Sequence, residues 1–178
     1  MAINSEIKDI SSFKGKDVII ATGAKPRRLN IKGIDKTIEA CEYLSGKEVG
    51  NTVAVIGGGL TGCEIAYELI LQGKNPIIVE MKDDLISQKG VCLANSSYLR
   101  EYFELKKTPV YLETLLDEVK DNSIVIKDKA GNKRDIAVDS VIMSTGYIPS
   151  PIAKKSSHVH LIGDCNKVGN LRTVIWKA

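Results

Sequence analysis

Six consecutive residues carry the clearest chemical signal in the chain: Gly57-Gly58-Gly59-Leu60-Thr61-Gly62. Their glycines fit the spacing G-x-G-x-x-G, which permits a tight turn, lets the backbone approach a pyrophosphate and lets a helix pack closely on a strand. A helix that opens on such a turn offers N–H groups and partial positive charge to phosphates. The spacing therefore predicts a dinucleotide phosphate site.

An acid follows the turn at the distance expected for a dinucleotide. Glu80 lies roughly 20 residues after the first glycine, where a carboxylate accepts hydrogen bonds from the adenosine ribose. The same carboxylate repels the 2′-phosphate of NADPH, so we expect NADH as the cofactor. Met81 and Lys82 follow and are candidate cofactor-binding residues. Glu64, in the first helical turn, suits the helix dipole with or without a ligand; we include it as a candidate.

The elements around these residues form a predicted βαβ unit. Thr52–Ile56 is a continuous apolar strand, residues 63–71 have a helical apolar stripe closed by Gly73, and residues 76–80 form a second strand. A strand–helix–strand unit of this length has parallel strands and a right-handed crossover. The unit places the glycine turn and Glu80 at the same edge of a sheet.

Further elements are predicted on both sides of this unit. Residues 95–97 cap a helix over 98–105, and residues 109–112 form a third parallel strand. Turn residues separate three short strands that form an antiparallel meander, at 115–119, 123–127 and 133–138. The remaining predicted elements are buried strands at 17–22, 139–145 and 158–162, a loop at 24–36 and a short helix at 37–44.

Composition places the chain among globular proteins. It has 178 residues, 43% of them hydrophobic and 26% charged, with a formal net charge of +3. That charge and an aromatic fraction of 5% do not favour a nucleic-acid partner. No segment has the apolar length of a membrane span, and residues 1–9 lack the apolar region of a signal peptide. We expect a cytoplasmic location by default.

Cysteine and histidine give no metal or disulfide pattern. Cys41, Cys63, Cys92 and Cys165 form no CxxC pair, so we expect buried or half-buried free thiols. The two histidines alternate at the end of the chain without a second ligand set, and no metal site is predicted. The basic run at 25–28 is a solvated turn or a contact to a cofactor phosphate; its sequence leaves both open.

Four motifs occur in one order along nearly the whole chain. They are Ile20-Ala21-Thr22-Gly23, the glycine turn at 57–62, Ser144-Thr145-Gly146-Tyr147-Ile148-Pro149, and Ile162-Gly163-Asp164-Cys165. This ordered set resembles flavoproteins with two dinucleotide-binding domains. It is most similar to the C-terminal region of the NADH:flavin oxidoreductases related to 2-enoate reductase and 2,4-dienoyl-CoA reductase.

The resemblance implies a fold and further site residues. It implies an α/β, Rossmann-like three-layer fold with a parallel sheet plus an antiparallel meander, of the FAD/NAD(P)-binding type. In such proteins an FAD domain is interrupted by the NADH domain. The implied flavin contacts are Thr22, Gly23, Gly163 and Asp164, and the implied residues near the nicotinamide are Thr145, Gly146 and Tyr147. Hydride passes from NADH to FAD, and electrons then reach FMN through an iron–sulphur cluster to reduce an activated C=C bond.

The chain departs from that family in ways that predict a fragment. It has no N-terminal G-x-G-x-x-G for FAD, no FMN barrel and no cysteine cluster. We therefore expect an NADH domain at 47–147 between two remnants of an FAD domain, 1–46 and 148–178. Its partner would be the remainder of a parent polypeptide, which would carry FMN and the iron–sulphur cluster. The isolated chain, to which we assign no catalytic residue, should bind NADH without turnover.

Three alternatives remain open at this stage. A non-catalytic NADH-sensing or interaction module uses the same fold, since a fold does not fix a function. A thioredoxin reductase type is opposed by the absence of CxxC. An S-adenosylmethionine methyltransferase also has a glycine-rich turn followed by an acid.

Overall fold

The computed structural model describes residues 3–88, 90–170, 173 and 175. It contains two compact units. The central unit is Arg28–Thr145, and the flanking unit is built from the chain segments before and after it. The chain leaves the flanking unit after Arg27 and returns to it at Gly146.

A five-stranded parallel sheet forms the middle of the central unit. In spatial order its strands are β3 (Ile38–Glu39), β10 (Ser140–Met143), β4 (Thr52–Ile56), β5 (Asn75–Val79) and β6 (Val110–Tyr111). Every neighbouring pair is parallel. The predicted third parallel strand is thus β6 at the sheet edge. All five carboxyl ends meet at one edge of the sheet, where the glycine turn and Glu80 follow β4 and β5.

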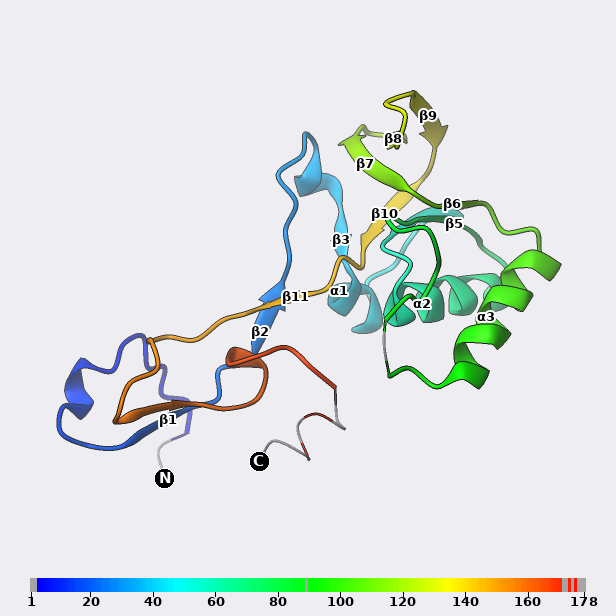
Figure 1. Ribbon diagram of the computed structural model, residues 1–178. Coiled ribbons are helices and arrows are strands. Elements are labelled where there is room, and N and C mark those ends of the chain that lie inside the picture. Colours follow the sequence, from blue (N-terminus) through cyan, green and yellow to red (C-terminus); the bar gives the residue numbers. More distant parts are fainter. Residues whose placement is uncertain (1–2, 89, 171–172, 174, 176–178) are drawn as a thin grey trace. The chain divides into compact units, whose positions relative to one another are not determined.

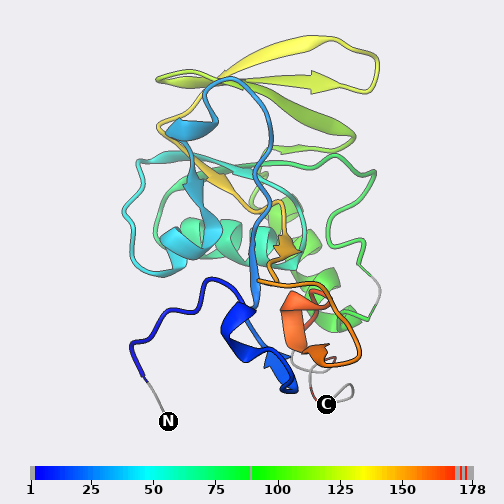
Figure 2. The same ribbon diagram turned by 90° about the vertical axis from the view of Figure 1, so that its left-hand side faces the viewer.

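Three helices cover one face of this sheet (Figure 2). They are α1 (Ala40–Leu44), α2 (Leu60–Leu71) and α3 (Leu93–Leu105). Val53 and Val55 of β4 pack among them, together with Leu69 and Phe103, all at most 2% exposed. Gly73 closes α2 as predicted, because it adopts a positive φ of 77° and Lys74 N–H donates to the Leu69 carbonyl at 2.9 Å.

An antiparallel meander covers the other face, as Figure 2 shows. Its strands are β7 (Thr114–Val119), β8 (Ser123–Asp128) and β9 (Lys133–Ala137), in the order predicted. Ala54 and Ile56, the alternate residues of β4, pack against its buried Leu116 and Ile124. The three layers are therefore helices, parallel sheet and meander, which confirms the predicted fold class.

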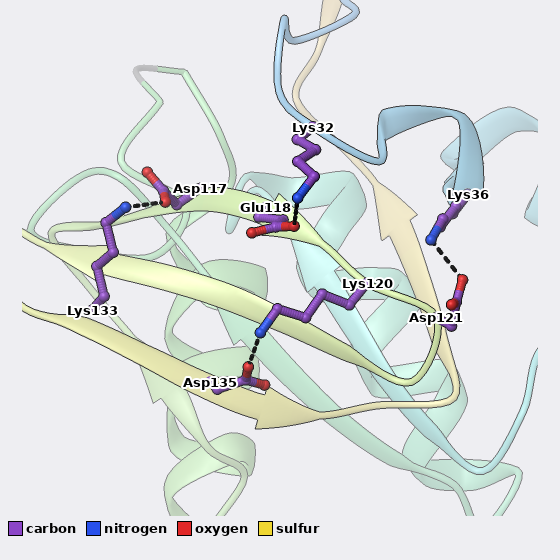
Figure 3. Close-up of polar contacts among 8 residues, drawn as sticks. All are labelled: Lys32, Lys36, Asp117, Glu118, Lys120, Asp121, Lys133 and Asp135. Carbon is purple, nitrogen blue, oxygen red and sulfur yellow. Dashed lines mark hydrogen bonds and ion pairs between the residues drawn. The ribbon is translucent and has the colours of Figure 1, made fainter.

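The segment before β3 packs against the meander and bonds the end of β7. Leu29, Ile31 and Ile34 pack on the core that the meander buries, and Val119 N–H donates to the Lys32 carbonyl at 2.9 Å. Ion pairs follow the same contact: Lys32 with Glu118 at 2.7 Å and Lys36 with Asp121 at 2.5 Å (Figure 3). We call this segment, residues 28–37, the clasp.

The flanking unit contains two small strand pairs (Figure 1). Strands β1 (Val18–Ile20) and β12 (Val159–Leu161) are parallel, whereas β2 (Ala24–Pro26) and β11 (Tyr147–Pro149) are antiparallel. Short 3-10 helices lie at Ser11–Phe13 and Gly163–Cys165. Its buried cluster consists of Ile20, Val159 and Cys165, a much smaller core than either core of the central unit.

Several predicted boundaries differ from the structure. The helix predicted over 37–44 starts at Ala40, because Ile38 pairs with Ile142 in the sheet first. Helix α3 starts at Leu93, five residues before the predicted start, so the expected cap at 95–97 lies inside the helix. There the Ser96 hydroxyl donates to the Leu93 carbonyl at 3.0 Å.

The predicted loop and domain boundary also change. Residues 24–36 were expected to be a loop but contain β2 and a 3-10 helix at Ile34–Lys36. The central unit starts at Arg28 rather than at residue 47, because β3 joins its sheet and Ala40 and Tyr43 of α1 enter its core. It ends at Thr145, two residues before the predicted boundary. No helix among the described residues is long and apolar enough to cross a membrane.

Candidate functional site

The glycine turn joins the carboxyl end of β4 to α2. Gly57 has a φ of 107°, which L-residues with side chains rarely adopt, and a Cβ there would lie 2.3 Å from the Ser144 carbonyl oxygen. Gly57 N–H donates to the Val79 carbonyl at 2.8 Å. The first glycine is therefore required by the turn itself and by the close approach of β10.

The last glycine of the motif brings the helix onto the turn. A Cβ on Gly62 would lie 1.9 Å from the Gly57 carbonyl oxygen and 3.3 Å from the Ser144 hydroxyl. Without it, the first turn of α2 reaches the end of β4 directly. This is the cradle expected at a phosphate-binding helix start, with unpaired N–H groups at the carboxyl edge of the sheet.

The Glu80 carboxylate holds the turn from the side of β5. Its Oε2 accepts a hydrogen bond from Gly58 N–H at 2.5 Å, and its Oε1 accepts one from Lys82 N–H at 2.9 Å. Glu80 is only 7% exposed. The sequence predicted a carboxylate that faces a ribose; the structure adds that it braces the glycine turn, because a buried carboxylate needs such donors.

The chain after Glu80 folds back onto Gly58, the glycine that donates to the Glu80 carboxylate. Ile86 N–H donates to the Gly58 carbonyl at 2.7 Å, and Ile86 has a φ of 49°, an unusual value for a β-branched residue. Arg100 of α3 fixes this fold, since its guanidinium donates to both Asp84 carboxylate oxygens at 3.0 and 2.8 Å and to the Leu85 carbonyl at 2.5 Å. We call residues 82–88 the return loop.

Sequence reasoning missed the return loop and its anchor. Asp84 and Arg100 lie on different elements, a loop and a helix, and no spacing rule joins them. A polar run after a strand end predicts a loop but not its direction. The signal lies only in the tertiary fold, where Arg100 of α3 contacts the loop that follows β5.

Cys63 lies in the first turn of α2, inside the central unit. Burial, with a smaller contribution from the Glu80 charge, raises the pKa of its thiol to about 12. Its Sγ is 3.4 Å from the Gly58 carbonyl oxygen, to which it donates. Cys63 is therefore a protonated core residue and not a nucleophile. Cys165 is also buried, whereas Cys41 and Cys92 are exposed, contrary to the expectation of four buried or half-buried thiols.

Met81 and Lys82 line a hollow of about 430 Å³ beyond the end of β5. Leu115 of β7 lies in its wall, with Lys127 of β8 and Lys129 just after that strand. Three carboxylates line it as well: Asp83, Glu113 and Asp128. Met81 is 67% exposed, which leaves an apolar side chain open at this rim. Met81 and Lys82 directly follow Glu80, so the hollow lies at the end of β5, where the sequence expects the adenosine part of a dinucleotide.

The other candidates of the central unit lie along the same edge. Leu60 is half-buried at the start of α2, and Thr61 is exposed in its first turn. Glu64 is exposed but lies beyond the first turn in which it was predicted, because α2 starts at Leu60 and not at residue 63. Thr145 is half-buried and follows Ser144 at the end of β10. The central unit thus brings the candidates at 57–64, 80–82 and 145 to the carboxyl side of one sheet.

The flanking unit holds the candidates assigned to a flavin. Thr22 and Gly23 contact Ser150, through a Thr22 hydroxyl donating to its carbonyl at 2.7 Å and Ser150 N–H donating to the Gly23 carbonyl at 3.0 Å. Gly163 and Asp164 form a 3-10 turn in which Asp164 accepts from Gly169 N–H at 3.1 Å.

Two further candidates belong to the strand pair of that unit. The Gly146 carbonyl accepts from Arg27 N–H at 2.9 Å, and Tyr147 begins β11. No glycine cradle like that at 57–62 occurs among the described residues of this unit. The described part of this unit thus differs from the central unit, where Gly57 and Gly62 form such a cradle.

The basic run and the histidines have ordinary polar neighbours. Arg28 lies 3.7 Å from the Glu39 carboxylate, whose pKa is raised mainly by burial. His158 and His160 both face Asp17, at 3.2 and 3.9 Å.

Comparison with protein families gives a match over residues 3–173. The matching model is that of the pyridine nucleotide-disulphide oxidoreductases. The chain is 36% identical, over 96% of its length, to a cinnamate reductase of Clostridium sporogenes. It is 27% identical, over 95% of its length, to an NADH oxidase of Thermoanaerobacter brockii.

A solved structure of a 2-naphthoyl-CoA reductase has a similar fold. It matches 88% of the chain with a TM-score of 0.75 and 26% identity. The chain spans 27% and 28% of the lengths of the two relatives above, and 25% of the length of this solved chain. It corresponds to about a quarter of each.

Proposed function

Because the chain belongs to the pyridine nucleotide-disulphide oxidoreductase family, we propose that its central unit is the NADH-binding domain of a flavin-dependent oxidoreductase. The observation that carries this proposal is the glycine cradle at the carboxyl edge of the sheet. A Cβ at Gly57 or Gly62 would overlap backbone oxygens, so only glycine fits at these two positions. The backbone N–H groups at the start of the helix can then contact a phosphate directly.

The proposed cofactor lies across the carboxyl edge of the sheet. Its pyrophosphate faces the glycines of the turn and the start of α2: Gly57, Gly58, Gly59, Leu60, Thr61 and Gly62, with Glu64 following on the same helix. The adenosine lies toward β5 and β6, next to Glu80, where Met81 and Lys82 line the hollow beside the meander. The nicotinamide then extends the other way, over β10, toward Ser144 and Thr145.

Glu80 sets the preference for NADH in this proposal. Its two oxygens each accept one main-chain hydrogen bond, and a carboxylate oxygen has a second lone pair for a ribose hydroxyl. A 2′-phosphate at that place would bring negative charge against a carboxylate held by the fold. Lys82 is close enough in sequence to offset part of this repulsion but is exposed and flexible.

We assign the flanking unit to the flavin side of the same reaction. Thr22, Gly23, Gly163 and Asp164 would contact FAD, with Gly146 and Tyr147 near the nicotinamide. When bound, NADH would supply a hydride and FAD would accept it. The chain's own residues bind and orient; none donates or removes a proton in this scheme.

The substrate class of the full-length protein is proposed from similarity. The cinnamate reductase and the 2-naphthoyl-CoA reductase are both named for reduction of unsaturated acids or their thioesters. We propose that the full-length enzyme reduces an activated C=C bond of this enoate or enoyl class. FMN and an iron–sulphur cluster would be carried by other parts of the parent polypeptide.

A non-catalytic NADH-sensing module is the second candidate function. Its support is the completeness of the central unit, which has its own cores on both faces of the sheet. The Gly163-Asp164 turn favours the reductase, because a sensor has no need of a flavin contact.

Amide chemical-shift mapping of the full chain with NADH tests the site. We expect the largest shifts at 57–62 and 80–82, with small shifts over β8 and β9. A Gly62→Val variant that remains folded should lose them. Shifts centred on the opposite, amino edge of the sheet would overturn the proposal.

A further inference from the structure

Gln88 lies at the end of the return loop, against the second glycine of the motif. Its amide nitrogen is 3.0 Å from the position that a Cβ on Gly59 would occupy, and its amide carbon is 3.8 Å away. We infer that the Gln88 side-chain amide is a pyrophosphate ligand of the bound dinucleotide, adding a side-chain donor to the main-chain donors of α2. This inference rests on the proposed function.

The geometry of Gly59 supports a ligand rather than a folding role at this place. Gly59 has φ −70° and ψ 179°, an ordinary backbone conformation open to any residue. Its nearest neighbour on that side is the far end of Gln88, a flexible side chain, and not backbone as at Gly57 and Gly62. The fold alone therefore does not demand a glycine here; close approach of a phosphate does.

Hydrogen bonds to Gly58 and Arg100 fix the return loop in the conformation that places Gln88 beside the glycine turn. Ile86 is 3% exposed, donates its N–H to Gly58 and keeps a φ of 49°. Such backbone strain persists only where the surroundings determine it, here through the Arg100 contacts to Asp84 and Leu85. The loop therefore runs toward the glycine cradle. Gln88 lies two residues after Ile86, the last residue of the loop that bonds the cradle.

The chemistry of the amide fits a pyrophosphate. A glutamine offers two N–H donors without charge, and a hydrogen bond to a charged oxygen is stronger than a neutral one. Gln88 is exposed, so its amide is not committed to the protein core. It is free to rotate from above Gly59 to the edge of a phosphate that enters there.

The test is a titration of the full chain with three probes, followed by amide chemical shifts: NADH, ADP-ribose and adenosine. Gln88→Ala should weaken NADH and ADP-ribose binding about five- to twentyfold and leave adenosine binding unchanged. Gln88→Glu should weaken both pyrophosphate probes further, because it places a carboxylate beside the phosphates. Ser87→Ala, at the exposed neighbouring position, should match the wild type with all probes.

The outcomes separate the role of Gln88 from the proposed NADH site. Wild-type affinity of Gln88→Ala for ADP-ribose would overturn the role of Gln88 and leave the NADH site standing. An equal loss for adenosine would also overturn it, since the residue would then act only on the shape of the loop. Failure of the wild-type chain to bind NADH or ADP-ribose would overturn the proposed function, and the Gln88 assignment with it.

Discussion

Glu80 is a buried acid of the central unit whose carboxylate is held by main-chain donors. It is 7% exposed and accepts from Gly58 and Lys82. One donor is in the glycine turn and the other is in the return loop, so Glu80 links the end of β5 to the glycine turn. A change at Glu80 therefore affects stability and cofactor choice together, and the two effects must be measured separately.

Glu80→Gln should destabilise the chain by about 1–3 kcal/mol. The glutamine NH₂ group is a donor, so it cannot accept from the second of the two N–H groups that the carboxylate satisfies. Urea unfolding measures the loss. Glu101→Gln, at an exposed carboxylate on α3, is the matched control and should change stability by less than about 0.5 kcal/mol. Equal effects of the two changes would contradict the bracing role.

The four cysteine thiols should fall into two pairs by their rate of reaction with a thiol reagent, two fast and two slow. Cys41 and Cys92 are exposed, whereas Cys63 and Cys165 are buried. The pKa of Cys63 is raised to about 12, so its reactive thiolate is scarce at pH 8. Reaction with a thiol reagent at pH 8 measures the rates, and Cys63 should react only on unfolding. Loss of a fast phase in Cys63→Ser would show that this thiol is accessible.

At the scale of elements, the apolar runs were the most predictable part. β4 and β5 are buried on both faces, so Thr52–Ile56 and its partner appear in the sequence as uninterrupted apolar segments. The meander was predictable for another reason, since turn residues at 121–122 and 130–132 separate its short strands.

Boundaries that depend on tertiary contacts could not be predicted. Ile38 becomes a strand only because β10 lies beside it, some hundred residues later in the chain. Asn95, Ser96 and Ser97 are typical cap residues that α3 tolerates inside its first turns because Ser96 bonds the helix backbone. In the site, the motif located the turn and the acid, whereas Gln88, Ile86 and Arg100 required the fold.

The meander should depend on its buried face and not on its ion pairs. Ile124→Ala, at a residue with no exposed area, should cost about 2–5 kcal/mol through lost burial and the cavity left behind. Lys32→Ala removes the exposed pair with Glu118 (Figure 3) and should cost less than about 1 kcal/mol. Thermal or urea unfolding of both variants compares the two effects. A larger effect of the Lys32 change would mean that the clasp, and not the core, holds the meander.

At the scale of the whole molecule, the two units differ in how much apolar surface they bury. The central unit has buried clusters on both faces of its sheet, whereas the cluster of the flanking unit is Ile20, Val159 and Cys165. Local stability follows buried contacts, so the two units should open with different free energies. The central unit should behave as the independently stable part.

Hydrogen exchange should follow that difference. Amides of β4 and β5 should be the best protected, and amides of β1 and β12 should exchange faster by at least about tenfold. Mass spectrometry of peptides from each unit measures the rates in one sample. Equal protection of 159–161 and 53–56 would show that the small cluster is as stable as the large cores.

The most direct test of the account is calorimetric titration of the full chain with NADH and then with NADPH. We expect saturable binding of NADH at one site and roughly 5- to 150-fold weaker binding of NADPH, which corresponds to about 1–3 kcal/mol of repulsion at Glu80. Gly62→Val, which blocks the cradle, should abolish binding of both. The account is contradicted if NADH gives no saturable heat, if the two cofactors bind equally, or if a folded Gly62→Val variant binds NADH as the wild type does.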